Sequence, residues 1–294
     1  SRSKGFSGIT LAKAADPDPG TMMQTRFDAA LRRQLRQVRG QLGLREAHAR
    51  PHFLGVGTQK GGTSTLFQLL SGHPEIFFPK VKEVHFFTKF YDRGEGWYSE
   101  NFAEAPAGQL RGEITPFYLF HAAVPERIQA LRANIKIVVL LRHPVERTLS
   151  QYYHSCRWNL ETLPLEAALA AEEERLHGAL EVIKTPGANH LSYQEHSYLA
   201  RSRYEEQLPR YFKCFGRDRV LVLRSEDLFC GDRGVITQLE RFLCIAPFPL
   251  ETSIPRANSG LGEARDVPSS VRCKLEKELA PTFTWLDKEL GLKW

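Results

Sequence analysis

The chain has 294 residues, of which 42% are apolar and 25% charged, an ordinary composition for a globular protein with a substantial core. Its 40 Lys and Arg exceed its 34 Asp and Glu by six, which suits an anionic ligand but falls short of the charge of a dedicated nucleic-acid-binding protein. No apolar run is long enough to cross a bilayer and the first residues lack a signal-peptide core, so we expect a cytoplasmic protein without a membrane partner. The five cysteines form no CxxC pair, so we expect reduced thiols and no metal site.

The first fifty residues differ in composition from the rest. Residues 1–20 are small and polar with Gly and Pro, and we expect a flexible leader. Residues 21–50 have the pattern of an amphipathic helix. Its apolar stripe is Phe27, Leu31, Leu35, Val38 and Leu42, and its basic face carries Arg32, Arg33, Arg36 and Arg39. We expect the stripe to pack on the core with the basic face in solvent; the alternative is a docking helix for a partner or a neighbouring domain.

Residues 51–294 read as one domain in which strands alternate with helices. Short apolar runs predict buried strands at residues 52–56, 135–141 and 219–223, and helical patterns occupy residues 64–71, 145–153 and 204–215. This alternation predicts an α/β fold with a central parallel sheet flanked by helices. Residues 161–200 are less regular, with an Ala/Glu-rich helix over 165–180 and a loop over 185–190, and we expect a lid-like insertion.

The strongest chemical signal lies between the first strand and its helix. It consists of Thr58, Gln59, Lys60, Gly61, Gly62, Thr63, Ser64 and Thr65. Glycines allow a tight turn whose N–H groups converge, a helix N-terminus adds partial positive charge, and the lysine and hydroxyls complete a P-loop-like phosphate cradle. It is not a Walker A loop, because Lys60 precedes the glycine pair instead of following it.

A second anion-binding signal stands at the end of the 135–141 strand. Arg142 follows this strand directly, and Ser150 lies about two turns along the next helix. Ligands of open α/β sheets bind at the carboxyl ends of strands, where Arg suits bidentate phosphate binding. A magnesium-dependent NTPase would favour an acidic residue at such a position to hold its metal. The alternative role for Arg142 is a surface salt bridge.

These motifs resemble those of the sulfotransferases that use 3′-phosphoadenosine 5′-phosphosulfate (PAPS). Residues 58–64 are similar to the family's 5′-phosphosulfate loop, and residues 141–150 to its 3′-phosphate motif. Residues 82–87 and 112–118 resemble the acceptor-side motifs of the heparan-sulfate branch and its bacterial relatives, which include sulfotransferase domains of polyketide and olefin synthases. Segments 204–208, 220–228 and 242–243 follow in the family's order, so the resemblance covers about residues 52–245.

The resemblance implies a role for each matched position. Lys60 would stabilise charge on the departing phosphate, residues 61–65 would hold the 5′-phosphate, and Arg142 and Ser150 would bind the 3′-phosphate. Glu83 would be the general base, with His85 as the alternative base and as an acceptor contact. Glu113 would contact the acceptor, as would His190 on the insertion unless it is an exposed loop residue. The family also closes a basic loop over the nucleotide, for which Arg256 and Arg265 are the candidates.

The acceptor motif departs from the family at one position. Heparan-type enzymes typically carry Lys where this chain has Ile114, which argues against a glycosaminoglycan acceptor. A hydroxyl on a small metabolite, or on a β-hydroxyacyl chain held by a carrier protein, suits the sequence better, and neighbouring domains of a larger protein would fit this interpretation. Two other functions stay open: a phosphoryl-transferring P-loop kinase or NTPase, and a non-catalytic nucleotide-binding module, against which the presence of both Lys60 and Glu83 argues.

Overall fold

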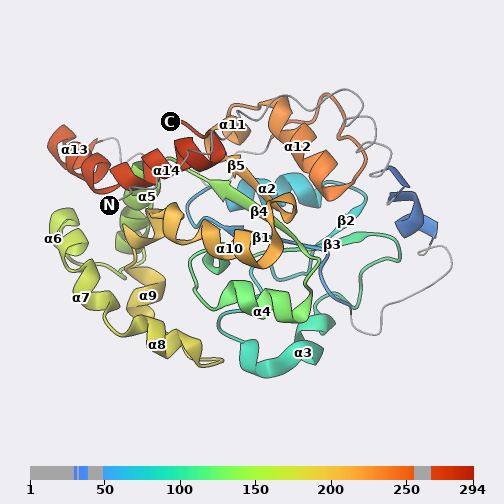
Figure 1. Ribbon diagram of the computed structural model, residues 1–294, viewed down its shortest axis with the longest axis horizontal. Helices are drawn as coiled ribbons and strands as arrows, with labels where there is room; N and C mark the ends of the chain where they lie inside the picture. Colours follow the sequence, from blue (N-terminus) through green and yellow to red (C-terminus); the bar gives the residue numbers. More distant parts are fainter. Residues whose placement is uncertain (1–29, 32, 39–48, 255–265) are drawn as a thin grey trace, which may run out of the picture.

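The computed structural model describes residues 30–31, 33–38, 49–254 and 266–294. A five-stranded sheet forms its centre, and every pair of neighbouring strands is parallel (Figure 1). In spatial order the strands are β2 (Ile76–Phe77), β3 (Leu110–Ile114), β1 (Phe53–Gly57), β4 (Lys136–Leu141) and β5 (Val220–Arg224). The three predicted strands and the parallel α/β architecture are thereby confirmed, and β2 and β3 add two strands that were not predicted.

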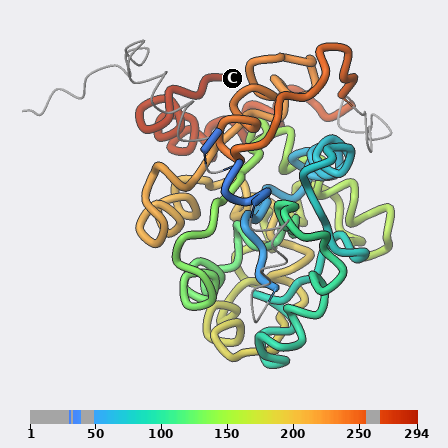
Figure 2. The backbone as a smooth tube through the Cα atoms, turned by 90° about the vertical axis from the view of Figure 1, so that its right-hand side faces the viewer, coloured from blue at the N-terminus to red at the C-terminus, as the bar shows by residue number. Residues whose placement is uncertain are grey.

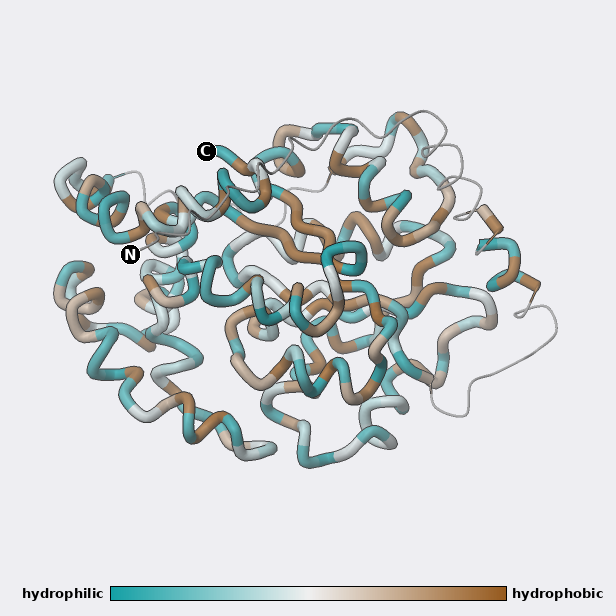
Figure 3. Tube along the Cα trace, in the orientation of Figure 1, coloured by the Kyte–Doolittle hydropathy of each residue, from teal (hydrophilic) through white to brown (hydrophobic). Residues whose placement is uncertain are grey.

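Alternate side chains of the strands enter two cores on opposite faces of the sheet. In β4, Val138 and Leu140 pack into one core, whereas Ile137 and Val139 pack into the other. The first face is covered by α2 (Thr63–Ser71), α11 (Ser225–Phe229) and α12 (Arg233–Leu243), and the second by α3 (Gly94–Glu100), α4 (Val124–Leu131), α10 (Leu208–Phe215) and α14 (Ala280–Leu290). Because both faces are covered, β1, β4 and β5 are apolar over most of their length, and Figure 3 shows hydrophobic segments at the centre of the molecule.

Parallel pairing brings the carboxyl ends of three strands together. β4 lies between β1 and β5, with Leu141 beside Arg224 and Val139 beside Gly57. The chain leaves β1 into α2, β4 into α5 (Pro144–Arg157) and β5 into α11. The segments that carry the two predicted phosphate motifs therefore start from neighbouring strands at one edge of the sheet.

The insertion differs from its expected form. The single helix expected over residues 165–180 is wrong, because the segment forms α6 (Leu165–Ala170), α7 (Glu172–Leu176) and α8 (Ala179–Lys184), followed by α9 (Leu191–Glu195). Gly178 separates α7 from α8 with a φ of +71°, a left-handed conformation that favours glycine. The helix expected over 204–215 is likewise divided into η4 (Tyr204–Glu206) and α10.

Short helical turns and one further helix complete the described chain. They are η1 (Tyr91–Arg93), η2 (Pro116–Tyr118), η3 (Ala200–Ser202), η5 (Arg217–Arg219) and α13 (Ser269–Glu278). In the tube of Figure 2 the last helices and the end of the chain lie along one side of the molecule, close to the segment that contains α11 and α12. Within the described residues, no helix has both the length and the apolar character needed to cross a membrane.

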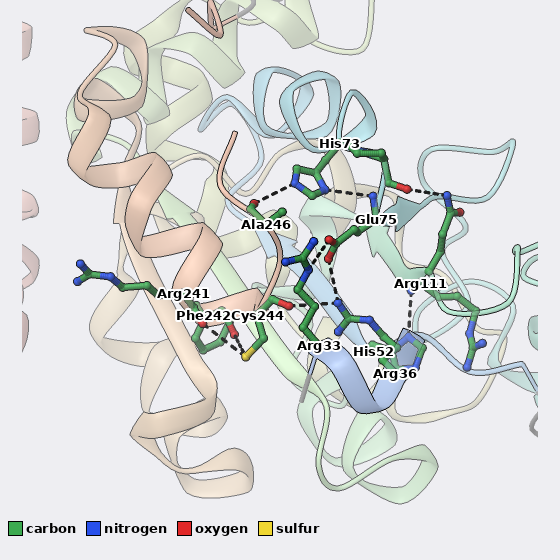
Figure 4. Close-up of polar contacts among 12 residues, drawn as sticks. Arg33, Arg36, His52, His73, Glu75, Arg111, Arg241, Phe242, Cys244 and Ala246 are labelled. Atoms are coloured by element: carbon green, nitrogen blue, oxygen red, sulfur yellow. Dashed lines mark hydrogen bonds and ion pairs between the residues drawn. The ribbon is translucent and has the colours of Figure 1, made fainter. Parts of the chain in front are cut away.

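The described part of the amino-terminal helix packs by its basic side. Arg33 Nε lies 2.5 Å from Glu75 Oε1, and Arg36 Nη2 lies 3.2 Å from Glu75 Oε2 (Figure 4). Arg36 also donates to the carbonyl oxygen of Cys244 at 3.1 Å. The apolar residues of the stripe are exposed instead: Leu31, Leu35 and Val38 are 44%, 54% and 42% exposed.

The expectation that the apolar stripe of this helix faces the core is therefore wrong for the described residues. The physical reason is the Glu75 carboxylate, whose side chain is 14% exposed and pairs with two guanidinium groups of this helix. The other stripe and basic-face residues of the prediction, Phe27, Leu42, Arg32 and Arg39, lie outside the described residues, as does the leader over 1–20.

Candidate functional site

The turn between β1 and α2 is tight and closely packed. Thr58 N donates to Leu140 O at 2.7 Å, which ties the turn to β4, and Gly61 N donates to Thr58 O at 2.9 Å. A Cβ atom on Gly61 would lie 2.8 Å from Leu140 O, so only glycine fits there. Lys60 and Gly62 have φ angles of +67° and +86°. A lysine held in the left-handed region is uncommon and marks a position whose orientation the surrounding structure imposes.

The helix α2 starts immediately after this turn, with Gly62 as its N-cap. As in any α-helix, its first N–H groups point out of the N-terminus, where they and the helix dipole favour an anion. Of the hydroxyl side chains, those of Thr58, Thr63 and Thr65 are buried, whereas Ser64 is partly exposed. Gln59 adds a buried Oε1 atom that has no hydrogen-bond partner within the described residues. The predicted cradle residues therefore lie together, with Lys60 and Ser64 at its accessible side.

Arg142 lies beside the cradle, as the end of β4 predicts. Its Nη1 donates to the carbonyl oxygen of Lys60 at 3.2 Å, and its own carbonyl oxygen accepts from Tyr204 Oη at 2.9 Å. Ser225 at the start of α11 donates to the carbonyl oxygens of Gly61 and Leu141, which joins β5 to the same corner. The structure thus brings Arg142 and Lys60 together.

The helix α5 carries the remaining residues of the predicted 3′-phosphate motif. Ser150 lies midway along α5 and is partly exposed. Arg147, by contrast, is fully buried and donates to Ser202 Oγ and Gln151 Oε1. Arg147 therefore serves the packing of α5, and Arg142 and Ser150 are the members of the motif that stay available to a ligand.

A chain of polar contacts joins the cradle to the predicted acceptor segment. Lys82 Nζ donates to Ser64 Oγ at 2.9 Å and to Glu83 Oε1 at 3.1 Å, and His85 Nε2 lies 3.6 Å from Glu83 Oε2. Lys82 was not among the predicted site residues. Its position beside Glu83 in the sequence was the available signal, but only the fold shows that its ammonium group spans the two motifs.

The environment of Glu83 favours its ionised form. Burial alone would raise the pKa of this carboxyl group, but the hydrogen bond with His85 and the positive charge of Lys82 outweigh it and hold the pKa below the ordinary value. The Glu83 side chain remains 37% exposed, so an acceptor can reach it. His85 has a φ of +57°. Lys60 and His85 are thus two of the four non-glycine residues with positive φ in the described chain.

Glu113 lies behind this segment without any exposed surface. Its carboxylate accepts hydrogen bonds from the hydroxyls of Tyr98, Thr115 and Tyr118, and burial raises its pKa. Tyr118 Oη in turn accepts from the backbone N–H of Phe87 at 3.4 Å. The contacts of Glu113 therefore lead to the acceptor segment through a tyrosine and not directly to the site.

One buried side chain, that of Arg127 in α4, joins the insertion to the predicted acceptor segment. Arg127 donates to the carbonyl oxygen of Phe87 at 2.8 Å and to that of Ile183 in α8 at 3.2 Å. His190 caps α9, because its Nδ1 accepts from Tyr193 N at 3.2 Å, and it is partly exposed. Arg256 and Arg265, the candidates for the closing loop, lie outside the described residues.

One further residue that the sequence did not indicate lies near Lys60. His154 on α5 has its pKa lowered to about 4, first by burial and then by the positive charges of Lys60 and Arg157. It is therefore a neutral imidazole at the edge of the site at pH 7. The described part of the chain contains no cluster of three or more His, Cys, Asp or Glu that could hold a metal ion.

Comparisons with known proteins agree with this geometry. The model of the sulfotransferase domain family matches residues 50–253. A membrane-associated sulfotransferase, kil1, of Dictyostelium discoideum is 36% identical over 150 residues, which cover 49% of this chain and 31% of that protein. Human heparan sulfate glucosamine 3-O-sulfotransferase 6 is 30% identical over 193 residues, covering 66% of this chain and 52% of that protein. The chain thus spans a third to a half of these relatives.

A solved structure gives a closer match in extent. The sulfotransferase from Alicyclobacillus acidocaldarius aligns with a TM-score of 0.69 and 28% sequence identity, covering 84% of this chain and 98% of that one. Because the alignment covers 84% of this chain, the similarity extends beyond the motif segments alone.

Proposed function

The chain belongs to the sulfotransferase domain family, and on this premise we propose that it transfers a sulfuryl group from PAPS to a hydroxyl acceptor and releases 3′,5′-ADP. The resemblance that the sequence motifs predicted is confirmed at the level of the family. The observation that carries the proposal is the contact chain from Ser64 through Lys82 to Glu83, which joins an anion cradle to a partly exposed carboxylate. Such a pairing suits transfer of an anionic group to a deprotonated nucleophile.

We propose that the donor end of the site binds a doubly phosphorylated nucleotide. The turn at Gly61, closed to any side chain, and the N-terminus of α2 would hold the 5′-phosphate, while Arg142 and Ser150 would hold the 3′-phosphate. Lys60 would face the bridging oxygen, where negative charge grows as the sulfuryl group departs. A fixed cation at that position stabilises the transition state more than the ground state.

At the acceptor end we assign the role of general base to Glu83. A base must be unprotonated and within reach of the acceptor, and Glu83 is partly exposed with a pKa below its ordinary value. His85 then orients the Glu83 carboxylate and contacts the acceptor. The proton of the acceptor hydroxyl passes to the Glu83 carboxylate as the oxygen attacks sulfur, and the bond from sulfur to the bridging oxygen breaks.

We further propose that the acceptor is a small hydroxyl metabolite or a β-hydroxyacyl chain on a carrier protein. Ile114 is fully buried, and Gly55 leaves room for its side chain, so this position presents no charge to a sulfated sugar. The relatives named for heparan sulfate make a glycosaminoglycan the alternative to test.

All five cysteines are free thiols, which fits the reducing cytoplasm that we propose as the location.

Mass spectrometry after incubation with PAPS tests the function. The acceptors are a phenol, a sterol, heparan sulfate and a hydroxyacyl carrier protein, each assayed with EDTA and with magnesium. Sulfuryl addition to any acceptor, unaffected by EDTA, is the expected result. Phosphorylation of an acceptor by ATP and magnesium without sulfuryl addition would favour the kinase alternative. Preferential binding of 3′,5′-ADP without transfer to any acceptor, in a chain carrying both Lys60 and Glu83, would favour the non-catalytic module.

A further inference from the structure

Trp294 makes a hydrogen bond to Glu226, which lies beside the proposed nucleotide site. Its indole Nε1 donates to Glu226 Oε2 at 2.8 Å, and the other oxygen of the same carboxylate, Oε1, accepts from the backbone N–H of His143 at 2.9 Å. The residue before His143 is Arg142, the proposed 3′-phosphate ligand. Resting on the proposed function, we propose that Trp294 is a positioning residue for the donor, and that it acts on the 3′-phosphate end of the site through Glu226.

The backbone around Arg142 is fixed from two sides. Tyr204 Oη donates to the Arg142 carbonyl oxygen, and Glu226 accepts from the N–H of the next residue, so both polar groups of this peptide unit are held by side chains. The Arg142 guanidinium then reaches the Lys60 carbonyl oxygen. The Glu226 carboxylate is one of the two groups that hold this peptide. A shift of the carboxylate would therefore move the backbone from which the Arg142 side chain extends.

The Glu226 carboxylate depends in turn on the indole. One of its oxygens meets a backbone N–H that cannot move independently of β4 and α5, and the other meets Trp294. Without the indole donor the carboxylate keeps one of these two hydrogen bonds and can rotate about it. Loss of this partner is expected to loosen the His143 peptide before it affects the rest of the sheet.

The ring itself is held in place by its surroundings. The Arg224 guanidinium lies 5.2 Å from the centre of the Trp294 ring, and the His143 ring lies 6.4 Å away in an edge-on arrangement. Leu290, Leu292 and Trp294 pack on the core of the second sheet face. Figure 1 shows this end of the chain close to α11, which begins next to Arg224. The indole therefore has a defined orientation at the carboxyl end of β5.

The test is the affinity for 3′,5′-ADP relative to 5′-AMP, measured by calorimetry on the full chain. Trp294→Phe keeps an aromatic ring but removes the donor, and should weaken 3′,5′-ADP about tenfold, the scale of one hydrogen bond to a charged group. The affinity for 5′-AMP should change little, because the effect reaches the 3′-phosphate ligand. The KM for PAPS should rise while the KM for the acceptor stays constant. Trp285→Phe on α14, partly buried in the same core, is the matched control and should leave the affinity ratio unchanged.

A double-mutant comparison tests the route through Glu226. Glu226→Gln alone should lower the affinity ratio, and adding Trp294→Phe should lower it little further, because both changes break the same link. Glu226→Gln also keeps the proposal testable if Trp294→Phe folds poorly. An unchanged ratio in the single variants, or fully additive losses in the double variant, would overturn the role of Trp294. A wild-type chain with no preference for 3′,5′-ADP would instead contradict the proposed function itself.

Discussion

The guanidinium of Arg142 donates a hydrogen bond to the backbone carbonyl oxygen of Lys60, with 3.2 Å between Nη1 and oxygen. The two residues are 82 positions apart in the sequence and belong to the turns after β1 and β4. Under the proposed function one residue holds the 3′-phosphate and the other the bridging oxygen of the phosphosulfate. Their contact therefore joins the two residues that would bind opposite ends of the donor.

Replacing Arg142 with Ala should remove discrimination between donor nucleotides. We expect the affinity for 3′,5′-ADP to fall about 10- to 100-fold, which corresponds to loss of a charge-assisted hydrogen bond, while 5′-AMP binding changes far less. Calorimetry with both nucleotides measures this difference. Arg217→Ala is the matched control, since Arg217 pairs with Glu289 away from the cradle. Equal losses for both nucleotides in the Arg142 variant would contradict the 3′-phosphate assignment.

Replacing Lys60 with Ala should act mainly on turnover. A cation that stabilises charge on the departing oxygen contributes to the transition state, so kcat should fall about 10²- to 10³-fold with a smaller change in 3′,5′-ADP affinity. Single-turnover transfer of labelled sulfate measures the chemical step. Lys80→Ala serves as the control, because Lys80 is exposed and pairs with Glu104. If only the KM for PAPS rose and kcat stayed constant, Lys60 would be a binding residue.

Replacing Glu83 with Gln should abolish most of the proton transfer. The expected loss of kcat is about 10²- to 10⁴-fold, with 3′,5′-ADP binding retained. Because the pKa of Glu83 is held below the ordinary carboxyl value of 4.5, the acid limb of the wild-type kcat profile should lie below that pH. His85→Asn should reduce the rate less than Glu83→Gln. The reverse order of the two effects would make His85 the base.

Glu113 should contribute to stability through its three hydroxyl donors. Glu113→Ala leaves the hydroxyls of Tyr98, Thr115 and Tyr118 without their acceptor, and an unsatisfied buried donor costs about 1–3 kcal/mol. Glu113→Gln keeps one oxygen and should lose less. Denaturant unfolding of the two variants measures the difference in the free energy of unfolding. An alanine variant as stable as the wild type would show that the network contributes nothing.

Two histidines with lowered pKa values should make the protein less stable in acid. Burial, with smaller contributions from nearby arginines, lowers the pKa of His52 to about 2 and that of His121 to about 3. In the unfolded chain the two imidazoles have the ordinary histidine pKa of 6.5 and take up protons below that pH, whereas in the folded chain they stay neutral. The free energy of unfolding therefore has its full value above pH 6.5 and decreases below it.

This loss should reach up to about 1.4 kcal/mol per pH unit for each imidazole. Urea unfolding at several pH values between neutrality and acid measures the slope. In His121→Phe the contribution of one imidazole is gone, so roughly half of this component of the slope should disappear. A variant with the wild-type slope would show that His121 takes up its proton in the folded state.

The sequence predicts the parts of the fold that depend on local pattern. The apolar runs of β1, β4 and β5 and the glycine-rich turn before α2 were readable because buried parallel strands and anion-binding turns have distinctive compositions. The strand β3 was not, since Leu-Arg-Gly-Glu-Ile lacks that pattern. Its Gly112 makes room for the Phe53 ring, and its Glu113 accepts from the hydroxyls of Tyr98 and Tyr118, so both compensations come from residues outside the strand.

In the candidate site too, some residues can be predicted from local sequence and others only from contacts in the fold. Lys60, Glu83 and Arg142 stand in motifs whose chemistry can be read directly. Lys82 and Trp294 are evident only from the fold. Lys82 contacts Ser64, which is 18 positions away in the sequence, and Trp294 contacts Glu226, which is 68 positions away. The predicted orientation of the amino-terminal helix is wrong, because the helical period alone does not show that Glu75 lies opposite its arginines.

The most direct measurement is a crystal structure of the chain with bound 3′,5′-ADP. We predict the 5′-phosphate at the N-terminus of α2 beside Lys60, and the 3′-phosphate in contact with Arg142 and Ser150. A nucleotide bound elsewhere on the molecule, with the Lys60 ammonium group far from either phosphate, would contradict it.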